Sequence, residues 1–327
     1  MSKIPNLRKI KGVDVALVDG DVLRYELGAV QLDHPFVEGA KIPAPANFIK
    51  NLVDLKIEEI LDATGVDDFV IYFTGPGNFR FDVATVQPYK GNRADFKKPY
   101  HWPTVDFVLK DQFKCKTIEG TEADDALALR QFKSLEESKD GGIRTVICSR
   151  DKDLRMTEGY HYSWACGKNQ PEKPLYWVEK MEGHKFFFKQ MLTGDNTDHI
   201  LGCAIKEEMT YKSGAKKGQK CIRRKGIGPA KAEKLLAEGK TCQQWYDIIQ
   251  AEYKKLYPKN WEEIMLENAR LLYIGQTYDN RFEWEWLGVE SKTIVEQVQN
   301  RSGETSDGGS SEDNNPSELI NTEQKDS

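Results

Sequence analysis

Carboxylates gather in one short segment of the chain. Glu122, Asp124 and Asp125 fall within four positions, directly before the apolar residues 126–129. Like charges this close repel, so another interaction must offset their repulsion. One alternative is a helix capped by Thr121, because acids in a first turn gain about 0.3–1 kcal/mol each from the macrodipole. The other is a divalent cation, since Mg²⁺ prefers carboxylate oxygen and water. The segment alone leaves both readings open.

Further acids follow segments that have the composition of β-strands. Residues 13–18 (VDVALV) end at Asp19, and residues 143–148 (IRTVIC) are followed by Asp151 and Asp153. A short strand at 116–118 leads in the same way into the first acidic segment. At Asp19, a turn that merely ends the strand is the alternative. Because open α/β sheets bind ligands beyond the carboxyl ends of their strands, the sequence predicts an α/β fold, with a parallel sheet and one acidic edge.

A last pair of acids, Asp195 and Asp198, follows an apolar helix that we expect to begin within 186–192. Acids three positions apart on a helical turn share a face. Gly65 is placed to end a helix over 46–61. The other expected elements are strands at 68–73, 160–164 and 175–178, helices at 104–114, 241–255 and 260–274, and a late strand or extended segment at 282–287.

Composition excludes several classes of protein. The chain has 327 residues, 39% hydrophobic and 30% charged, which is typical of a globular protein with one large or two ordinary domains. It has no apolar run of about 18 residues and no signal-peptide pattern, so we expect a cytoplasmic protein without a membrane segment. Its six cysteines lack C-x-x-C spacing and indicate neither a zinc ribbon nor a disulfide framework.

The net charge of −5 is unevenly distributed. Residues 302–327 carry seven acids and one lysine, a charge of −6, which leaves +1 for residues 1–301. We expect this tail to be disordered, because it has almost nothing apolar to bury. Since several acids of the body cluster, the rest of its surface is basic, and a polyanionic partner is favoured.

Residues 79–101 form the first basic segment, in which cations alternate with aromatic residues. The cations are Arg80, Lys90, Arg93, Lys97 and Lys98. Cations neutralise phosphates and aromatic rings stack on exposed bases, so this composition is typical of a surface that contacts single-stranded nucleic acid. A solvated loop with its aromatic residues packed inward is the alternative.

Residues 206–231 form the second basic segment, with nine lysines and arginines against two glutamates, a charge of +7. It contains Gly226-Ile227-Gly228, flanked by Lys225 and Lys231. Gly-x-Gly lets the backbone turn into a helix whose first N–H groups can bind phosphate. We do not read it as a Rossmann fingerprint, because no long strand is expected before it. A plain helix–turn–helix connection is the alternative.

Six motifs in order resemble the 5′→3′ exonuclease and flap endonuclease family, and most of all its stand-alone phage exonucleases. They are 18–21 (VDGD), 89–93 (YKGNR), 119–125 (EGTEADD), 151–153 (DKD), 194–198 (GDNTD) and 226–228 (GIG). The resemblance spans about residues 13–240. It implies a PIN-like core over 1–202 with a helical arch or gateway at about 79–114. Residues 203–301 would hold the basic insertion, a helix–hairpin–helix DNA-binding region and the last helices.

The resemblance implies roles for individual acids. First-metal ligands are matched by Asp19, Glu122 and Asp124. The group around a second metal is matched by Asp151, Asp153, Asp195 and Asp198, while Asp125 matches another acid of the cluster.

It also implies roles in substrate binding. Tyr89, Lys90 and Arg93 resemble gateway residues that stack on the terminal nucleotide and hold the scissile phosphate. Arg80, Lys97 and Lys98 would be further substrate contacts. The residues that match a backbone grip on duplex phosphate, which in relatives also binds K⁺, are Lys225, Gly226, Ile227, Gly228 and Lys231.

Two departures from the family pattern stand out. Relatives usually carry another Asp just after the second strand, where this chain has Gly75, so water or Asp21 would have to replace that ligand. A basic insertion of about twenty residues lies between Gly202 and Lys225. Its lysines would either extend the track for duplex DNA or form a mobile loop.

The function that the resemblance implies is a 5′→3′ exodeoxyribonuclease with 5′-flap endonuclease activity, acting through two Mg²⁺ or Mn²⁺ ions in phage DNA replication, DNA degradation and primer removal. Its partners would be duplex DNA with a 5′ end or flap, RNA–DNA hybrid, and replication proteins through the acidic tail. It would act as a monomer in the cytoplasm of the infected host. A PIN-type ribonuclease and a catalytically weakened DNA-binding protein stay open as alternatives.

Overall fold

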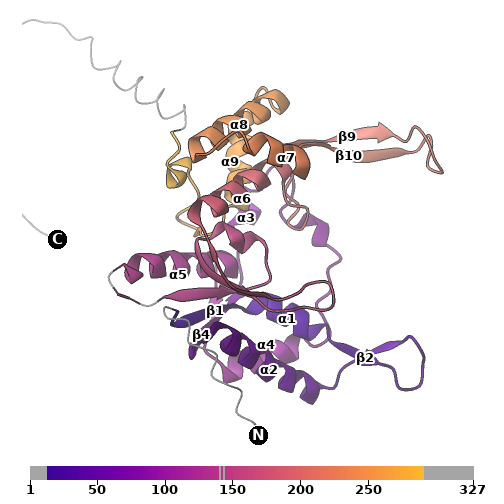
Figure 1. Cartoon of the computed structure of the whole chain (residues 1–327). Helices are drawn as coiled ribbons and strands as arrows, with labels where there is room; N and C mark the ends of the chain where they lie inside the picture. Colours follow the sequence, from indigo (N-terminus) through magenta and orange to yellow (C-terminus); the bar gives the residue numbers. More distant parts are fainter. Residues whose placement is uncertain (1–12, 140, 143, 291–327) are drawn as a thin grey trace, which may run out of the picture. The chain divides into compact units, whose positions relative to one another are not determined.

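A mainly parallel sheet forms the centre of the protein (Figure 1). The structure is a computed structural model that describes residues 13–139, 141–142 and 144–290. Contacts group Met1–Val289 into one unit and Glu290–Ser327 into another, and the acidic tail predicted for 302–327 lies outside the described residues. The sheet has six strands in the order β5-β4-β1-β6-β7-β8, and each neighbouring pair is parallel except β7 with β8. The predicted α/β fold is confirmed. The strands are β1 (Val15–Asp19), β4 (Asp68–Thr74), β5 (Cys115–Ile118), β6 (Thr145–Cys148), β7 (Gly159–Ser163) and β8 (Lys173–Val178).

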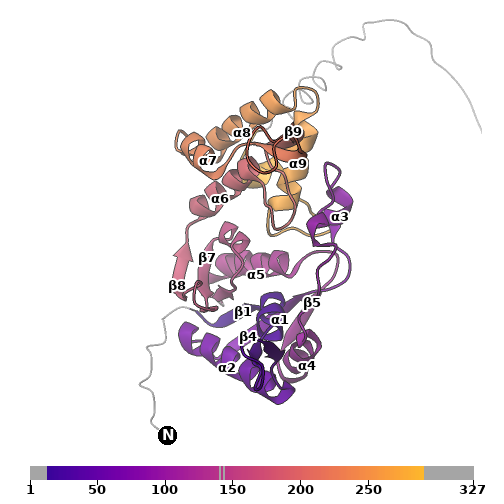
Figure 2. The same ribbon diagram turned by 90° about the vertical axis from the view of Figure 1, so that its right-hand side faces the viewer.

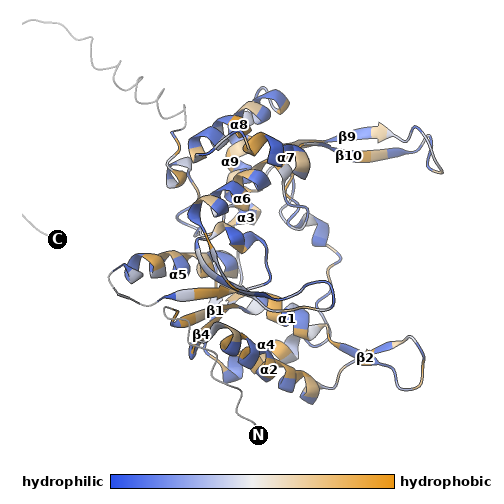
Figure 3. Cartoon of the chain, viewed as in Figure 1, coloured by the Kyte–Doolittle hydropathy of each residue, from blue (hydrophilic) through white to orange (hydrophobic). Residues whose placement is uncertain are grey.

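Alternate residues of the central strands pack into two different hydrophobic cores. Ala16 and Val18 of β1 belong to one core, while Leu17 belongs to the other. Val70 and Ile71 of β4 divide in the same way. Burial on both faces explains why these strands read as continuous apolar runs rather than as an alternation. Figure 3 shows the hydrophobic colour concentrated along the sheet.

Three helices cover one face of the sheet. They are α1 (Gly20–Gly28), α2 (Ala46–Thr64) and α4 (Trp102–Gln112), which pack against one another (Figures 1 and 2). Gly65 ends α2 with φ 68°, as its position predicted. The helix predicted at 104–114 is present as α4. Its residues Val105 and Leu109 are fully buried, so this part of the predicted gateway packs into the core beside α1 and α2.

The other face carries α5 (Ala123–Ser138) and, beyond it, a group of helices. That group comprises α6 (Lys180–Thr193), α7 (Pro229–Leu236), α8 (Cys242–Leu256) and α9 (Trp261–Leu272). Phe187 of α6 packs on Phe282 and Trp284. The segment predicted as a late strand or extended packing segment contains the 3₁₀ helix η3 (Trp284–Leu287), because its aromatic rings pack into these helices rather than pairing with a strand.

Two β-hairpins extend from the core. One joins β2 (Gln31–Asp33) to β3 (Lys41–Pro43), and the other joins β9 (Ala204–Thr210) to β10 (Lys220–Gly226) (Figure 1). The second contains the basic insertion. A strand of seven residues therefore precedes Ile227, contrary to the expectation that no long strand does. Its side chains are mostly exposed, so it lacks the apolar pattern that reveals a buried strand. Among the described residues, no helix has both the length and the apolar character needed to span a membrane.

Candidate active site

Asp19 ends β1 and caps α1, which places it at the carboxyl edge of the sheet. Its Oδ1 accepts hydrogen bonds from the backbone N–H groups of Asp21 (3.0 Å) and Val22 (3.1 Å). Its Oδ2 accepts one from the Ser149 hydroxyl (2.7 Å). Burial, and then the charge of Asp21, raise the pKa of Asp19 to about 6. The chain after this strand therefore continues as a helix rather than as the alternative turn.

The first acidic segment begins α5. The residue that caps this helix is Glu122, whereas the sequence suggested Thr121. Asp124 lies in the first turn, where the helix macrodipole favours acids. Burial, followed by the charges of Asp19 and Asp151, raises the pKa of Asp124 well above its usual value. Acids from three chain segments therefore repel one another around Asp124.

Asp151 and Asp153 follow β6, and Asp153 begins the 3₁₀ helix η2 (Asp153–Met156). The backbone N–H of Asp153 donates to Oδ1 of Asp151 (2.8 Å). Burial first, and then nearby carboxylates, raise the pKa of Asp151 to about 6 and that of Asp153 to about 7. The Ser149 hydroxyl accepts from the backbone N–H of Asp151 (2.9 Å) while it donates to Asp19. Ser149 thus ties the acidic ends of β1 and β6 together.

Asp195 and Asp198 lie in the loop after α6, and Lys152 connects this loop to η2. The Lys152 ammonium pairs with Asp195 and, at 2.9 Å, with Asp153. Burial acts to raise the pKa of Asp195, but the hydrogen bond and charge of Lys152 outweigh it and hold that pKa below its usual value. The pKa of Asp198 is raised, by burial first and also by the charge of Glu122. Acids of four chain segments are thus close enough to shift one another's pKa.

Lysine and arginine side chains form ion pairs with several of these carboxylates. Lys90 pairs with Glu122, and Arg93 pairs with Asp198 at 2.8 Å. Among the described residues, no three His, Cys, Asp or Glu side chains are arranged to hold a metal ion. The structure thus draws the acids together without forming a set of ligands around a common point.

The chemistry of the donors nevertheless suits a hard divalent cation. Burial first, and then the charges of other carboxylates, raise the pKa of Asp19, Asp124 and Asp151. The donors are carboxylate oxygens, which Mg²⁺ and Mn²⁺ prefer. A bound cation would relieve the repulsion, so these residues fit the metal that the resemblance implies.

Arg80 has a structural position, which corrects its predicted role as a substrate contact. Its side chain is 0% exposed. The guanidinium donates to both oxygens of Asp125 (2.6 and 2.9 Å) and to the carbonyl groups of Leu271 (3.0 Å) and Tyr273 (2.8 Å). A buried guanidinium that donates these four hydrogen bonds cannot reach a nucleic acid.

Asp125 is the partner of Arg80, and this corrects its predicted place among the metal ligands. Its side chain is also 0% exposed. Besides Arg80, its oxygens accept from the Thr121 hydroxyl (2.5 Å) and from the backbone N–H groups of Gly275 (3.0 Å) and Gln276 (3.1 Å). Burial acts to raise the pKa of Asp125, but Arg80 outweighs it and lowers that pKa. Asp125 therefore holds the start of α5 in place.

The predicted gateway residues Tyr89, Lys90 and Arg93 border the acids. Tyr89 is 3% exposed, and its hydroxyl lies 3.0 Å from carboxylate oxygens of both Glu122 and Asp198. Its predicted stacking on a nucleotide does not agree with this burial, because the ring has no free face. Lys90 has a φ of 52°, which is rare for a residue other than glycine. Backbone in such a conformation is often found at functional sites, and the ammonium of Lys90 pairs with Glu122.

Lys97 and Lys98 lie in the exposed loop before α4. The Nζ of Lys98 is 5.3 Å from the centre of the Trp102 ring, a cation–π contact that leaves the ammonium in solvent. Among the described residues, neither lysine forms a hydrogen bond or an ion pair with the acids. Their role in binding substrate stays a prediction.

The predicted phosphate grip follows β10 and begins α7, which has Gly228 as its N-cap and Pro229 in its first turn. A Cβ on Gly228 would meet no atom within 4 Å, so this backbone is accessible from outside. Ile227 is buried in the core and fixes the loop. Lys225 and Lys231 pair with Glu207 (3.0 Å) and Glu252 (3.3 Å) at the surface. The binding of phosphate or K⁺ by this loop stays a prediction.

Gly75 cannot be replaced by an acid without a rearrangement of the strand end. A Cβ there would lie 2.7 Å from the Ile118 carbonyl oxygen. Asp21 lies nearby instead, because its Oδ2 accepts from the backbone N–H of Thr74 (3.1 Å) and its charge helps to raise the pKa of Asp124. The Oδ1 of Asp21 pairs with Arg24, so the replacement of the missing acid by water or by Asp21 stays a prediction.

Ser149 and Lys152 were not among the predicted site residues. Both stand beside the acids in residues 149–153 (SRDKD), and this proximity is the signal in the sequence that could have identified them.

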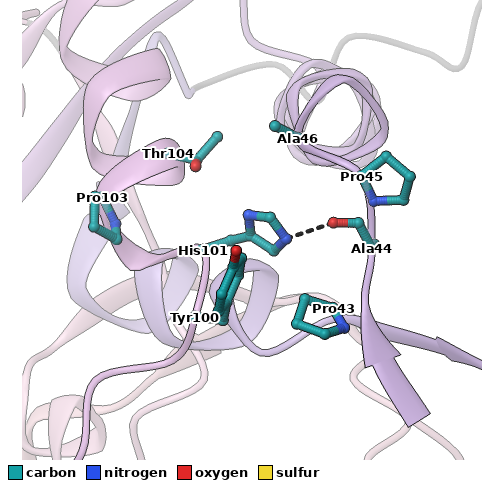
Figure 4. Close-up of a pocket in the computed structure, with 8 residues that line it drawn as sticks. All are labelled: Pro43, Ala44, Pro45, Ala46, Tyr100, His101, Pro103 and Thr104. Atoms are coloured by element: carbon teal, nitrogen blue, oxygen red, sulfur yellow. Dashed lines mark hydrogen bonds between the residues drawn. The ribbon is translucent and has the colours of Figure 1, made fainter.

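A cavity of about 530 Å³ elsewhere is lined by Pro43, Ala44, His101 and their neighbours (Figure 4). His101 Nε2 is 2.5 Å from the Ala44 carbonyl oxygen, and no carboxylate lines this cavity. It is therefore distinct from the acidic site.

Comparison with solved structures identifies the fold. A structure of bacteriophage T5 5′-exonuclease with divalent metal ions (zinc) bound has a TM-score of 0.51 and 16% sequence identity, over 80% of this chain and 90% of the T5 chain. The chain has the fold of T5 5′-exonuclease. The PIN-like fold that the resemblance implied is thus confirmed, while the arch and the helix–hairpin–helix region stay predictions.

Two further solved structures are similar at lower scores. A T5 flap endonuclease in a pseudo-enzyme-product complex with DNA and metal ions has a TM-score of 0.47 and 15% identity, over 79% of this chain and 88% of the T5 chain. Human GEN1 in complex with Holliday junction DNA has a TM-score of 0.38 and 13% identity, over 80% of this chain and 57% of that one. Comparison with protein-family models gave no match, and neither did comparison with curated protein sequences.

Proposed function

We propose that the protein is a divalent-metal-dependent nuclease that hydrolyses phosphodiesters from the 5′ ends of duplex DNA and cleaves 5′ flaps. The observation that carries this proposal is the convergence of acids from four chain segments, which Ser149, Lys152 and the Tyr89 hydroxyl join through hydrogen bonds and ion pairs. The T5 5′-exonuclease fold supports it, since a structure of that protein holds divalent metal ions. A role in phage DNA replication and primer removal belongs to the same proposal.

The proposed ligands divide between two ions of Mg²⁺ or Mn²⁺. Asp19, Glu122 and Asp124 would hold the first ion. Asp21 would replace the acid that relatives carry at the position of Gly75. The second would be held by Asp151, Asp153, Asp195 and Asp198. When bound, such ions lower the pKa of an attacking water and stabilise charge on the attacking and leaving oxygens.

Cationic residues of the chain would then act on the phosphate. In this structure Lys90 and Arg93 form ion pairs with Glu122 and Asp198. During the reaction both cations would bind the oxygens of the scissile phosphate and stabilise the added negative charge of the transition state. Lys152 would keep Asp153 and Asp195 in place beside them.

The proposal is tested with Asp151→Asn combined with Asp153→Asn. Release of short products from 5′-labelled flap, nicked and blunt duplexes in Mg²⁺ should fall at least about a thousandfold, because the loss of one catalytic electrostatic contact alone reduces kcat by about 10²–10³. Glu58→Gln combined with Asp62→Asn removes the same charge from exposed positions on α2 and should leave the rate unchanged. Retained cleavage by the first variant would refute the assignment.

Comparison of substrates separates the alternatives. A PIN-type ribonuclease would cleave single-stranded RNA faster than nicked DNA, and would overturn the substrate that we propose. Binding of DNA without hydrolysis in either Mg²⁺ or Mn²⁺ would instead identify a DNA-binding protein without activity. The lengths of the products on flap and blunt ends show whether cleavage proceeds mainly from the end or at the base of the flap.

A further inference from the structure

The β9–β10 hairpin is a strongly basic and exposed structure. Residues 204–226 carry eight lysines and arginines against Glu207 and Glu208, a charge of +6. Every residue from 211 to 220 is exposed. The loop between the strands bends at Gly214 and Gly218, which have positive φ angles of 77° and 84°. The insertion is thus an ordered antiparallel pair that presents a cationic tip.

The cations of the hairpin differ in their partners. Near the strands, Lys220 pairs with Glu208 (2.7 Å) and Lys225 with Glu207 (3.0 Å). The loop contains Lys212, Lys216 and Lys217 without any acid, and no ion pair involves these three within the described chain. Lysines that repel one another at a tip destabilise it, so a polyanion that binds there would gain both attraction and relief of repulsion.

The base of the hairpin lies between the acidic site and the predicted phosphate grip. At the start of β9, the Nζ of Lys206 is 3.3 Å from Nε2 of His199, which follows Asp198. Arg224 anchors β10 by donating to the carbonyl groups of Thr193 (2.7 Å) and Leu201 (2.9 Å). Two residues after Arg224, β10 passes directly into the Gly226–Gly228 loop. The hairpin is therefore anchored at its base by Arg224 and projects outward beside α7 (Figure 1).

We propose that the β9–β10 hairpin binds the phosphate backbone of the duplex DNA whose end lies at the acidic site. This inference rests on the proposed function. Strands of seven residues extend about 24 Å at about 3.4 Å per residue. That length corresponds to about seven base pairs of duplex. The hairpin thus reaches phosphates well beyond the scissile bond, and lysine recognises them as a point charge without reading sequence.

The test substitutes the three loop lysines, in the variant Lys212→Gln, Lys216→Gln and Lys217→Gln. Binding to a fluorescent nicked duplex is measured by anisotropy in EDTA over a range of salt concentrations. The slope of log K against log salt should fall by about 0.9 for each phosphate contact that is lost, so by about 2 to 3 in the triple variant. Affinity for a single strand of the same sequence should change less, because the hairpin binds the duplex.

Two variants with matched design separate the roles of charge, position and folding. Lys→Arg at the same three positions keeps the charge and should restore the slope of the wild type. Lys139→Gln, Lys168→Gln and Lys173→Gln removes the same charge from other exposed positions and should leave the slope unchanged. An unchanged melting temperature of the first variant shows that the loop lysines do not act through folding.

The outcomes distinguish this inference from the proposed function. If wild-type protein cleaves DNA and the loop variant keeps the slope of the wild type, the hairpin proposal is refuted and the function stands. An equal loss of slope in the Lys139, Lys168 and Lys173 variant, or an equal loss of affinity for single strand, also refutes it. If no metal supports cleavage but the loop variant still loses its slope, the hairpin binds DNA and the nuclease proposal fails.

Discussion

Two adjacent acids at the start of α5 are expected to respond in opposite ways to neutralisation. Asp125 is bound on all sides by donors, whereas Asp124 is surrounded by other acids. In the absence of metal, Asp125→Asn should destabilise the protein and Asp124→Asn should stabilise it. The two substitutions are chemically identical and lie one residue apart, so each controls for the other.

The size of the first effect follows from the burial of the ion pair. Arg80 and Asp125 are both 0% exposed, and loss of one partner of a buried pair destabilises by about 3–5 kcal/mol. Asparagine also turns an amide NH₂ toward the donors that Asp125 now satisfies. For Asp124, burial and the charges of Asp19 and Asp151 oppose ionisation, so removal of its charge relieves repulsion.

Urea denaturation followed by circular dichroism in EDTA gives the two free energies of unfolding, and repetition with Mg²⁺ tests the ligands. Saturation at about 100 times Kd adds about 2.7 kcal/mol for one ion. Asp125→Asn should keep the increment that Mg²⁺ gives the wild type, while Asp124→Asn should lose much of it. Exposed Asp62→Asn should change stability by less than about 0.5 kcal/mol.

Two results would refute this reasoning. If Asp125→Asn unfolds with a free energy within about 1 kcal/mol of the wild type, the buried ion pair does not hold α5 as described. If Asp125→Asn abolishes the Mg²⁺ increment while Asp124→Asn keeps it, the assignment of the two acids is reversed.

Two other predictions concern Lys90 and His161. Lys90→Ala should slow cleavage at saturating DNA about a hundredfold while it changes Kd for duplex less than about threefold, because the ammonium acts on the transition state; equal losses in rate and affinity would contradict this. Burial lowers the pKa of His161 to about 4, so its neutral form is favoured in the fold. Its contribution to stability is therefore complete above the unfolded pKa of about 6.5 and is lost as pH falls toward 4, by about 1.4 kcal/mol per unit. His161→Gln keeps a donor for the Thr157 carbonyl and should remove this loss of stability at low pH. If the free energies of unfolding of the two proteins, measured against pH in EDTA, run parallel, the prediction is wrong.

Much of the fold could be predicted because its strands and helices carry simple patterns. The strands at β1, β4 and β6 are apolar on both faces, and α2, α8 and α9 have regular apolar stripes. The β9–β10 hairpin could not be predicted in this way, since both of its faces are largely exposed. Hydrogen bonds between the backbones of its two strands, and those of the Arg224 side chain at its base, hold it together. The place of α4 in the fold could not be predicted either, because it depends on contacts with α1 and α2, which lie far away in the chain.

The site was predictable as a set of acids but not in its division of roles. The spacing of the acids indicated the same role for Asp124 and Asp125. Their partners from distant segments of the chain give them different roles. The donors to Asp125 include Gly275 and Gln276, which lie 150 and 151 positions away. Similarly, the composition around Tyr89 indicated a ring available for stacking, and only the packing shows that its hydroxyl lies between two acids.

The Arg80 ion pair also constrains the order in which the chain can mature. Arg80 lies 191 and 193 positions before the carbonyl groups it binds, in Leu271 and Tyr273. During synthesis, the start of α5 is made long before the residues that complete its support. A nascent chain that ends before Gly275 leaves Asp125 without two of its donors. The start of α5 therefore gains its full set of donors only after residues 275–276 have left the ribosome, long after the acids themselves have been made.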